Sequence, residues 1–343
     1  MTPPIKNEGI EIRGLYKVFG TSPRSCLPLI RDGISKSELL EHHNHVLALE
    51  DINLSVAPHS IHVIMGLSGS GKSTLIRHVN RLIDPTDGII RIGTEDVLNM
   101  DHRRLTEFRR NKVSMVFQRF ALLPHYDVAE NVSYGLKAQG LSKAQREKKA
   151  ADWIVKVGLE GFENAFPHQL SGGMQQRVGL ARALATDTNI LLMDEAFSAL
   201  DPLIRSEMQE LLLHLQTELK KTILFVTHDL DEAIRIGERI AILRDGLIVQ
   251  NDTSQGIVLN PADDYIAEFT KGINRGRVIE VGSILNNDLS DQDLTKCPSN
   301  TCLEDGLSAA MNTPDGRLLI TDDQGNDVGI LSASEIVAAM QVK

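Results

Sequence analysis

The segment that most constrains the fold of this chain is the glycine-rich loop Gly66-Leu-Ser-Gly-Ser-Gly-Lys-Ser73. Its G-x-x-x-x-G-K-S spacing is typical of loops that wrap the phosphates of a nucleoside triphosphate, and such a loop connects a strand to a helix. The apolar run Ile61–Met65 precedes it, and the segment from Thr74 to Ile83 has apolar residues at helical spacing. The loop therefore predicts an α/β fold with a P-loop core that binds a nucleoside triphosphate.

The residues of this loop have complementary roles in phosphate binding. Glycines let successive backbone N–H groups turn toward one anion, and the following helix adds the positive end of its dipole. We expect Lys72 to reach the β- and γ-phosphates and the Ser73 hydroxyl to bind Mg²⁺. The candidate ATP-binding residues here are Gly66, Ser68, Gly69, Ser70, Gly71, Lys72, Ser73 and Thr74.

Three later apolar runs each end in polar residues that suit ATP hydrolysis. The run 190–193 ends in Asp194 and Glu195. A carboxylate at the end of a buried strand needs a compensating cation, which favours Mg²⁺ at Asp194. Glu195 points to the opposite face and can address the attacking water. Gln118 and His228 follow the other two runs, where they can contact the Mg²⁺ shell and the γ-phosphate. The candidate catalytic residues are Lys72, Gln118, Glu195 and His228, and the candidate Mg²⁺ ligands are Ser73, Gln118 and Asp194.

The stretch Leu170-Ser-Gly-Gly-Met-Gln-Gln-Arg177 fits a second anion site, although taken alone it is explained as well by a serine-capped helix with a flexible glycine pair. Ser171 stands where a helix N-cap is expected, and Gly172 and Gly173 follow it with bare backbone N–H groups. The loop at 66–73 already binds the chain's own phosphates. A second site makes sense if it closes over the γ-phosphate bound to another copy of the chain.

Composition excludes several classes of protein. The formal net charge of −10 argues against a nucleic-acid ligand. No apolar run approaches the ~20 residues that cross a bilayer, and the first residues lack the apolar core of a signal peptide. Three sparse cysteines are typical of free thiols in a reducing compartment. We therefore expect a cytoplasmic protein whose membrane role, if any, depends on a partner chain.

The chain divides into regions of different character. Residues 21–45 predict a small helical insertion near the base end of the nucleotide, which we interpret as a surface decoration; its helix starts at Ser35 with a capping Glu38. The pattern predicts mostly helices over residues 126–165 and alternating strands and helices from 190 to 236. The acidic region from about residue 275 predicts a separate β-β-α appendage.

Taken together, residues 8–250 resemble the nucleotide-binding subunit of ATP-binding-cassette transporters. Leu170–Arg177 is similar to the signature of that family, and Ser198-Ala-Leu-Asp201 to its dimer-contact loop. The resemblance implies that Gln118 and His228 occupy switch positions and that Phe19, or alternatively Tyr16, stacks on adenine. It also implies a head-to-tail homodimer with two ATP at the interface, contacted in trans by Ser171 and Gly173, with Gly172 as a further candidate ATP-binding residue.

Longer segments resemble the ATPases of glycine betaine/proline-type importers. These include Leu15-Tyr-Lys-Val-Phe-Gly20, Phe117-Gln-Arg-Phe-Ala-Leu-Leu-Pro-His125 and Asp194-Glu-Ala-Phe-Ser-Ala-Leu-Asp-Pro202. The resemblance implies a peripheral ATPase on the cytoplasmic side of the inner membrane, bound to integral permease subunits and served indirectly by a substrate-binding protein. Glycine betaine, proline betaine, choline, carnitine and trimethylamine N-oxide remain open as solutes.

The resemblance also sets the expected domains. An ATP-binding domain spans 1–274, with a helical subdomain at about 119–170, and the tail 275–343 is similar to one cystathionine-β-synthase-type repeat. Members of the superfamily that act in DNA repair or on ribosomes are the alternative. The acidic charge and the short spacing from Ser73 to Ser171 disfavour them. A purely regulatory module is disfavoured by Glu195.

Overall fold

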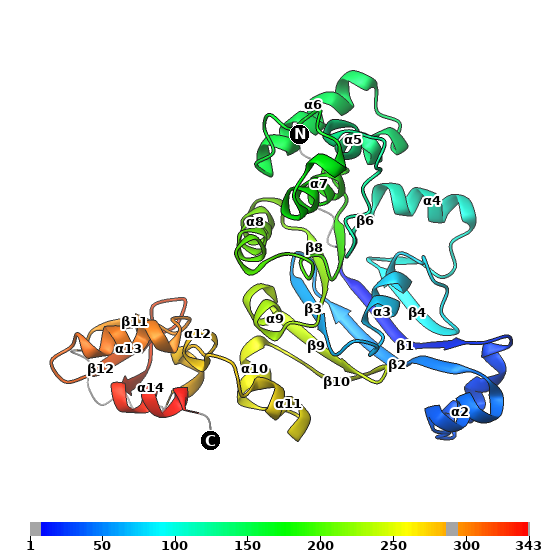
Figure 1. Ribbon diagram of the computed structural model, residues 1–343. Coiled ribbons are helices and arrows are strands. Elements are labelled where there is room, and N and C mark those ends of the chain that lie inside the picture. The colour runs from blue at the N-terminus through cyan, green and yellow to red at the C-terminus, as the bar shows by residue number, and fades with distance from the viewer. Residues whose placement is uncertain (1–7, 286–293, 342–343) are drawn as a thin grey trace. The chain divides into compact units, whose positions relative to one another are not determined.

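The computed structural model describes residues 8–285 and 294–341, and its internal contacts divide the chain after Asn251 (Figure 1). This division falls earlier than the expected boundary at 274. The difference arises because the short helices that follow Asn251 pack against one another and against the tail. None of the helices in these described ranges is both long enough and apolar enough to span a bilayer.

A six-stranded sheet forms the centre of the first unit. Its strands lie in the order β10 (Leu247–Asp252), β9 (Arg239–Arg244), β3 (Ile61–Met65), β8 (Thr222–Thr227), β7 (Ile190–Asp194) and β6 (Val113–Val116). The strands from β9 to β6 run parallel to their neighbours. Every residue of β3, β7 and β8 is buried, as expected for parallel strands covered on both faces.

A second sheet packs against the first through a shared core. It contains β2 (Val46–Val56), β1 (Ile10–Phe19), β4 (Asp87–Ile92) and β5 (Glu95–Asp96), with antiparallel pairing. One hydrophobic cluster joins the buried faces of both sheets to the helix α3 (Lys72–Val79). This core anchors the loop at 66–71 between a central strand and a packed helix.

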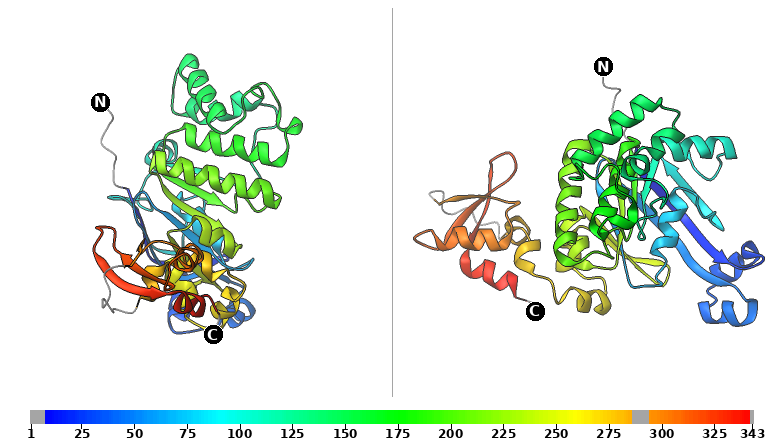
Figure 2. Two further views of the ribbon diagram at one scale, coloured as in Figure 1. Left: turned by 90° about the vertical axis from the view of Figure 1, so that its left-hand side faces the viewer. Right: turned by 45° about the horizontal axis from the view of Figure 1, so that its top comes forward.

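Helices complete the unit. Those beside the sheets are α4 (His102–Asn111), α8 (Pro202–Leu219) and α9 (Leu230–Ile236). A separate group comprises α5 (Val128–Ala138), α6 (Lys143–Lys156), the 3₁₀ turn η2 (Pro167–Gln169) and α7 (Gly172–Ala185). This group has its own hydrophobic cluster and gathers at the end of the unit remote from the insertion (Figure 2). The helix α3 ends at Val79, four residues before the predicted end, because the chain turns at Asn80 and Arg81.

The segment between β1 and β2 is helical, as predicted. It contains η1 (Pro23–Cys26), α1 (Leu27–Arg31) and α2 (Lys36–His43). The predicted cap is present, because Ser35 accepts a hydrogen bond from the backbone N–H of Glu38 and the Glu38 carboxylate accepts one from the backbone of Ser35.

The second unit is an α+β structure. It begins with α10 (Ser254–Leu259), α11 (Asp264–Thr270), α12 (Arg275–Val278) and η3 (Val281–Ile284). There follow β11 (Lys296–Pro298), α13 (Leu303–Met311), β12 (Arg317–Thr321), β13 (Asp327–Ser332) and α14 (Ala333–Met340). The two predicted strands, β12 and β13, and the predicted final helix, α14, are present. The predicted β-β-α order is incomplete, because β11 and α13 precede it and β11 pairs parallel to β12.

Candidate functional site

The parallel strands bring the predicted catalytic residues to one edge of the central sheet. β3 ends at the glycine-rich loop, β7 ends at Asp194, β6 is followed by Gln118, and β8 is followed by His228. Carboxyl ends of parallel strands share one edge, where α/β proteins bind their ligands. Residues that are more than a hundred positions apart in the chain therefore become neighbours at this edge.

The loop at 66–71 has a backbone that only glycine tolerates at its turning points. At Gly66 (φ 155°), a Cβ would lie 2.1 Å from the Leu243 carbonyl oxygen. At Gly71 (φ 105°), a Cβ would lie 2.9 Å from the carbonyl oxygen of Ala48. The hydroxyl of Ser70 is buried and has no hydrogen-bond partner among the described residues. The loop is thus held closely against β9 and β2, with its open side toward solvent.

Asp194 contacts residues of the first two turns of α3. Its side chain is 2% exposed, accepts a hydrogen bond from the Ser73 hydroxyl at 2.7 Å, and forms an ion pair with Arg77 at 3.0 Å. A buried carboxylate next to a hydroxyl supplies the oxygen ligands that Mg²⁺ prefers, and Arg77 supplies compensating charge. These residues fit the predicted Mg²⁺ site.

The carboxylate of Glu195 contacts the other three candidate catalytic residues. Its carboxylate accepts a hydrogen bond from the Gln118 amide at 2.9 Å and lies 3.6 Å from the Lys72 ammonium and 3.5 Å from the Nδ1 atom of His228. Asp194 and Glu195 thus contact different partners. Burial lowers the pKa of Lys72, and the two carboxylates oppose that shift.

The backbone at Glu195 is strained to present this side chain. Its φ of 47° lies in the left-handed region, which costs a non-glycine residue of order 1 kcal/mol. The backbone N–H donates to the carbonyl of Val226 at 3.0 Å, so β8 holds the residue in place. Strain of this kind persists where surrounding structure fixes it, and it is common at functional sites.

These residues border a cavity of about 500 Å³. The predicted residues that line it are Phe19, Ser68, Gly69, Gly71, Lys72, Ser73, Thr74, Gln118 and Glu195. Phe19 is 43% exposed, and the Lys17 ammonium lies over its ring, 4.7 Å from the centroid. Tyr16 does not line the cavity; its ring is covered by the guanidinium of Arg31, 5.5 Å from the centroid. Of the two aromatic candidates, only Phe19 is available to a base in the cavity.

The predicted signature residues lie away from this cavity. Ser171 caps α7, accepting a hydrogen bond from the Met174 N–H, and neither it nor Gly172 or Gly173 lines the cavity. Gly173 packs against α8, since a Cβ there would lie 2.5 Å from the Cγ2 atom of Ile204. Asp201, also outside the cavity, caps the same helix α8. The structure therefore brings the signature and the loop at 198–201 together, apart from the chain's own phosphate loop.

Sequence reasoning missed part of the cavity wall. Lys36, Val46, Leu47, Ala48, Asp245 and Gly246 also line it. Interpreting the insertion as a surface decoration was wrong, because Lys36 belongs to it. The signal that could have revealed Asp245 and Gly246 is the one used for Gln118: they follow the parallel strand β9 directly.

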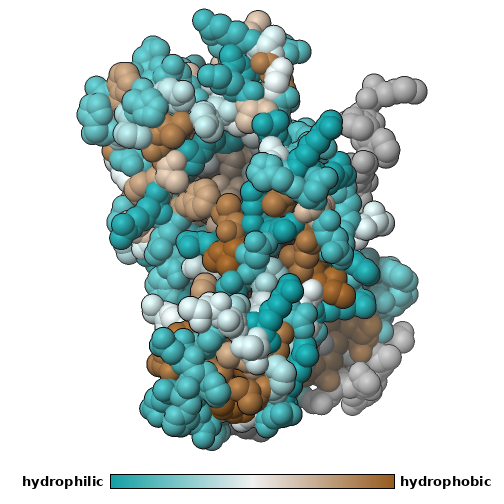
Figure 3. All heavy atoms as spheres, turned by 90° about the vertical axis from the view of Figure 1, so that its right-hand side faces the viewer, coloured by the Kyte–Doolittle hydropathy of each residue, from teal (hydrophilic) through white to brown (hydrophobic). Residues whose placement is uncertain are grey.

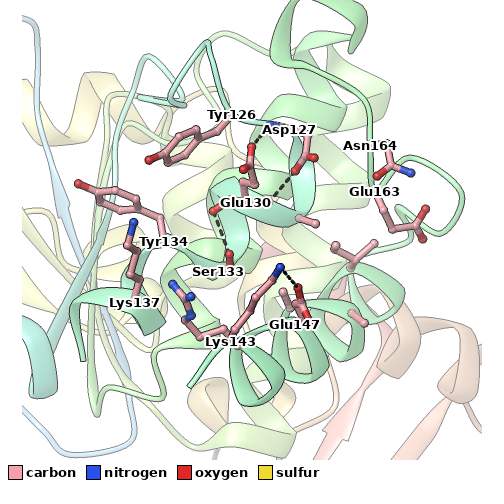
Figure 4. Close-up of a pocket in the computed structure, with 15 residues that line it drawn as sticks. Tyr126, Asp127, Glu130, Ser133, Tyr134, Lys137, Lys143, Glu147, Glu163 and Asn164 are labelled. Atoms are coloured by element: carbon pink, nitrogen blue, oxygen red, sulfur yellow. Dashed lines mark hydrogen bonds and ion pairs between the residues drawn. The ribbon is translucent and has the colours of Figure 1, made fainter. Parts of the chain in front are cut away.

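Two further cavities lie near the helical group. A groove of about 480 Å³ runs between α4, β6, α5 and α7, and the face in Figure 3 shows apolar residues around a recess with polar residues beside them. A cavity of about 430 Å³ between α5 and α6 is lined by charges of both signs (Figure 4). There Lys143 pairs with Glu147 at 3.7 Å, and Asp127 and Glu130 cap α5. Those side chains are already engaged in holding the helices.

Comparisons with known proteins agree on one family. The family model described as "ABC transporter" matches residues 49–198. The chain is 50% identical to the glycine betaine transport ATP-binding protein of Bacillus subtilis, covering 82% of this chain and 67% of that protein. It is 42% identical to the trimethylamine N-oxide transport system ATP-binding protein of Pelagibacter ubique, covering 96% of each. A solved dimeric ATP-binding cassette bound to ADP and phosphate matches with a TM-score of 0.61 at 34% identity, covering 71% of this chain and 98% of that one.

Proposed function

The chain belongs to the ABC transporter family, and from this premise we propose that it is the ATP-hydrolysing subunit of an importer for methylated-amine osmolytes. The observation that carries the proposal is the convergence of Lys72, Gln118 and His228 on Glu195 beside a phosphate loop. The names of relatives refer to glycine betaine, proline betaine, carnitine and trimethylamine N-oxide, which all carry a methylated nitrogen. These names favour transport over the alternative roles in DNA repair or on ribosomes.

In this proposal each side chain of the site has its own role in ATP binding or hydrolysis. The loop N–H groups and Lys72 bind the β- and γ-phosphates, and Phe19 stacks on the adenine base. Glu195 orients the attacking water and accepts its proton, Gln118 fixes the carboxylate, and His228 donates to the γ-phosphate. Ser73, Asp194 and Gln118 would hold Mg²⁺, which supplies charge neutralisation at the phosphates when bound.

The position of the signature supports a dimer. Ser171, Gly172 and Gly173 form the N-terminus of a 14-residue helix that faces no part of the chain's own cavity. In the proposed head-to-tail pair, this N-terminus closes over the γ-phosphate held by the other copy, together with Asp201. Two ATP molecules then lie at the interface, and their hydrolysis reopens it.

The groove between α4, β6, α5 and α7 is the proposed docking site for a short helix of the permease. Its floor is apolar, with Met115, Phe117 and Leu123, and Arg109 and Arg110 also line it. An amphipathic helix with acidic residues at its edge fits this chemistry. Through this contact the chain sits at the cytoplasmic face of the inner membrane.

Substitution of Leu123 tests the docking site. Leu123→Asp places a charge on the apolar floor and should abolish co-purification with the permease subunits. Val155→Asp adds the same charge at an exposed position on α6 and should leave co-purification intact. Equal co-purification of both variants with the permease contradicts this docking site.

The tail from about residue 275 is proposed to be a single cystathionine-β-synthase-type repeat, which forms one compact unit with the short helices that follow Asn251. Its strand and helix order β-α-β-β-α, from β11 to α14, supports this assignment.

The transport function is tested by solute uptake in cells. Cells in which the chain carries Glu195→Gln should fail to accumulate labelled glycine betaine, carnitine and trimethylamine N-oxide at high osmolarity. A plasmid copy of the unmodified gene should restore uptake of the transported solute. Unchanged uptake of every methylated amine would refute the proposed solute class.

A further inference from the structure

The insertion between β1 and β2 places one lysine at the nucleotide cavity. Lys36 is the first residue of α2, directly after the Ser35 cap, and it lines the same cavity as Phe19 and Lys72. A first-turn residue of a capped helix has a well-defined position, because the reciprocal Ser35 and Glu38 hydrogen bonds fix that turn. The insertion thus presents a cation to the cavity from an element outside both sheets.

The insertion is attached firmly to the wall that carries Phe19. A hydrophobic cluster joins Leu39 of α2 and Ile30 of α1 to Val18 of β1 and Leu47 of β2. Leu39 is fully buried in it. Val18 directly precedes Phe19, and Leu47 itself lines the cavity. Packing of this kind places α2 and the two strand ends in one fixed wall.

The ammonium group of Lys36 lies next to Asp245 and Gly246 in the turn between β9 and β10. It donates a hydrogen bond to the carbonyl oxygen of Asp245, and a Cβ at Gly246 would lie 3.1 Å from its nitrogen. Burial lowers the pKa of Lys36, while Asp245 and Glu50 oppose the shift. An ammonium has three donors, and the contact with Asp245 uses one of them. Donors therefore remain for an acceptor in the cavity.

The β9–β10 turn is itself tied to the phosphate loop. The backbone N–H of Gly246 donates to the carbonyl of Ser70 at 3.0 Å, and the N–H of Glu50 donates to the carbonyl of Gly246 at 2.9 Å. Lys36, held at this turn, is consequently fixed relative to the loop that holds the phosphates. Lys36 lines the cavity together with Val46, Leu47 and Phe19, the proposed adenine-stacking residue.

We propose that Lys36 is a nucleotide-binding residue that donates a hydrogen bond to the adenosine half of the nucleotide. It acts from the side of the cavity where α2 packs against Val18 and Leu47, next to Phe19. The inference rests on the ATP site proposed above and adds to it a contact supplied by the insertion. The insertion then contributes to nucleotide affinity.

The test is nucleotide binding by the full chain, measured with fluorescent N-methylanthraniloyl derivatives of ATP and ADP. Lys36→Met removes the charge and keeps the length of the side chain. It should raise the Kd values for ATP and ADP by the same factor, about tenfold for the loss of a hydrogen bond from a charged donor. Lys36→Arg should recover part of that loss.

A matched control separates this contact from the stability of the insertion. Arg31→Met removes a cation from α1 of the same insertion, where Arg31 pairs with the exposed Asp87 outside the cavity. It should leave both Kd values unchanged. Thermal unfolding shows whether the variants remain folded.

The outcomes are distinct. Unchanged Kd values for Lys36→Met, a loss for ATP but not for ADP, or an equal loss for Arg31→Met each overturn the proposal. Failure of the unmodified chain to bind either nucleotide instead refutes the ATP site itself.

Discussion

Replacing Glu195 by glutamine should stop hydrolysis without weakening ATP binding. The amide keeps the shape of the carboxylate, including the contact with Gln118, but cannot take a proton from water. Loss of a general base costs ~10²–10⁴ in rate, or about 3–5 kcal/mol in the barrier. The charge is also removed 3.6 Å from the Lys72 ammonium, and both side chains are mostly buried.

Removal of this negative charge next to Lys72 also predicts how the affinity for ATP changes. Two charges at this separation attract by about 4–5 kcal/mol at an effective dielectric constant of 20, before desolvation. In the unmodified chain the phosphates compete with Glu195 for Lys72, and in the variant they do not. The Kd for ATP should therefore be equal or lower, and ATP should raise the Tm of the variant by at least as much.

The assay combines phosphate release with fluorescence binding of ATP. The variant Glu210→Gln is the matched control, because Glu210 is an exposed carboxylate on α8 that pairs with Arg235, and neither residue lines the cavity. It should hydrolyse ATP like the unmodified chain. Near-normal phosphate release by Glu195→Gln, or clearly weaker ATP binding, refutes the assigned role of this carboxylate.

Three further predictions concern stability, assembly and the tail. Burial lowers the pKa of His78 to about 4, so only the unfolded state binds a proton there as the pH falls from ~6.5 toward 4. The free energy of unfolding is therefore unaffected by protonation of His78 above this window and falls within it. Between pH 7 and pH 5, urea unfolding should show that the free energy of unfolding of His78→Leu falls by about 2 kcal/mol less than that of the unmodified chain. Ser171→Asp keeps an N-cap but adds an anion, and gel filtration should show no ATP-driven dimer, whereas Ser142→Asp at the cap of α6 should dimerise normally. Truncation after Asn274 should leave ATP hydrolysis intact, and loss of nucleotide binding on truncation would show that the tail is needed for the ATP site.

The site was predictable because its residues obey a positional rule. Asp194, Glu195, Gln118 and His228 each follow an apolar run, and parallel strands carry their ends to one edge. The rule needs no knowledge of tertiary contacts beyond parallel pairing. It predicts that the candidate catalytic groups Gln118, Glu195 and His228 gather at one edge of the sheet.

The missed features depend on contacts that no local pattern records. The strand β11 has only three residues, and its pairing with β12 joins segments more than twenty residues apart. The helix α13 has a buried Gly306 and a buried Ala310, so its apolar spacing is weak. Lys36 lines the cavity because Leu39 packs against Val18 and Leu47, in the two strands that flank the insertion, and this packing cannot be deduced from the helix pattern alone.

The shared ATP site is tested most directly by mixing two inactive variants. Lys72→Ala removes the phosphate-loop lysine, and Ser171→Asp blocks the signature, so each variant alone should hydrolyse no ATP. In a mixed dimer one interface pairs the intact loop of one copy with the intact signature of the other. Hydrolysis should therefore reappear on mixing. If the mixture stays as inactive as its components, each chain uses its own signature, and the account of ATP bound between two copies is contradicted.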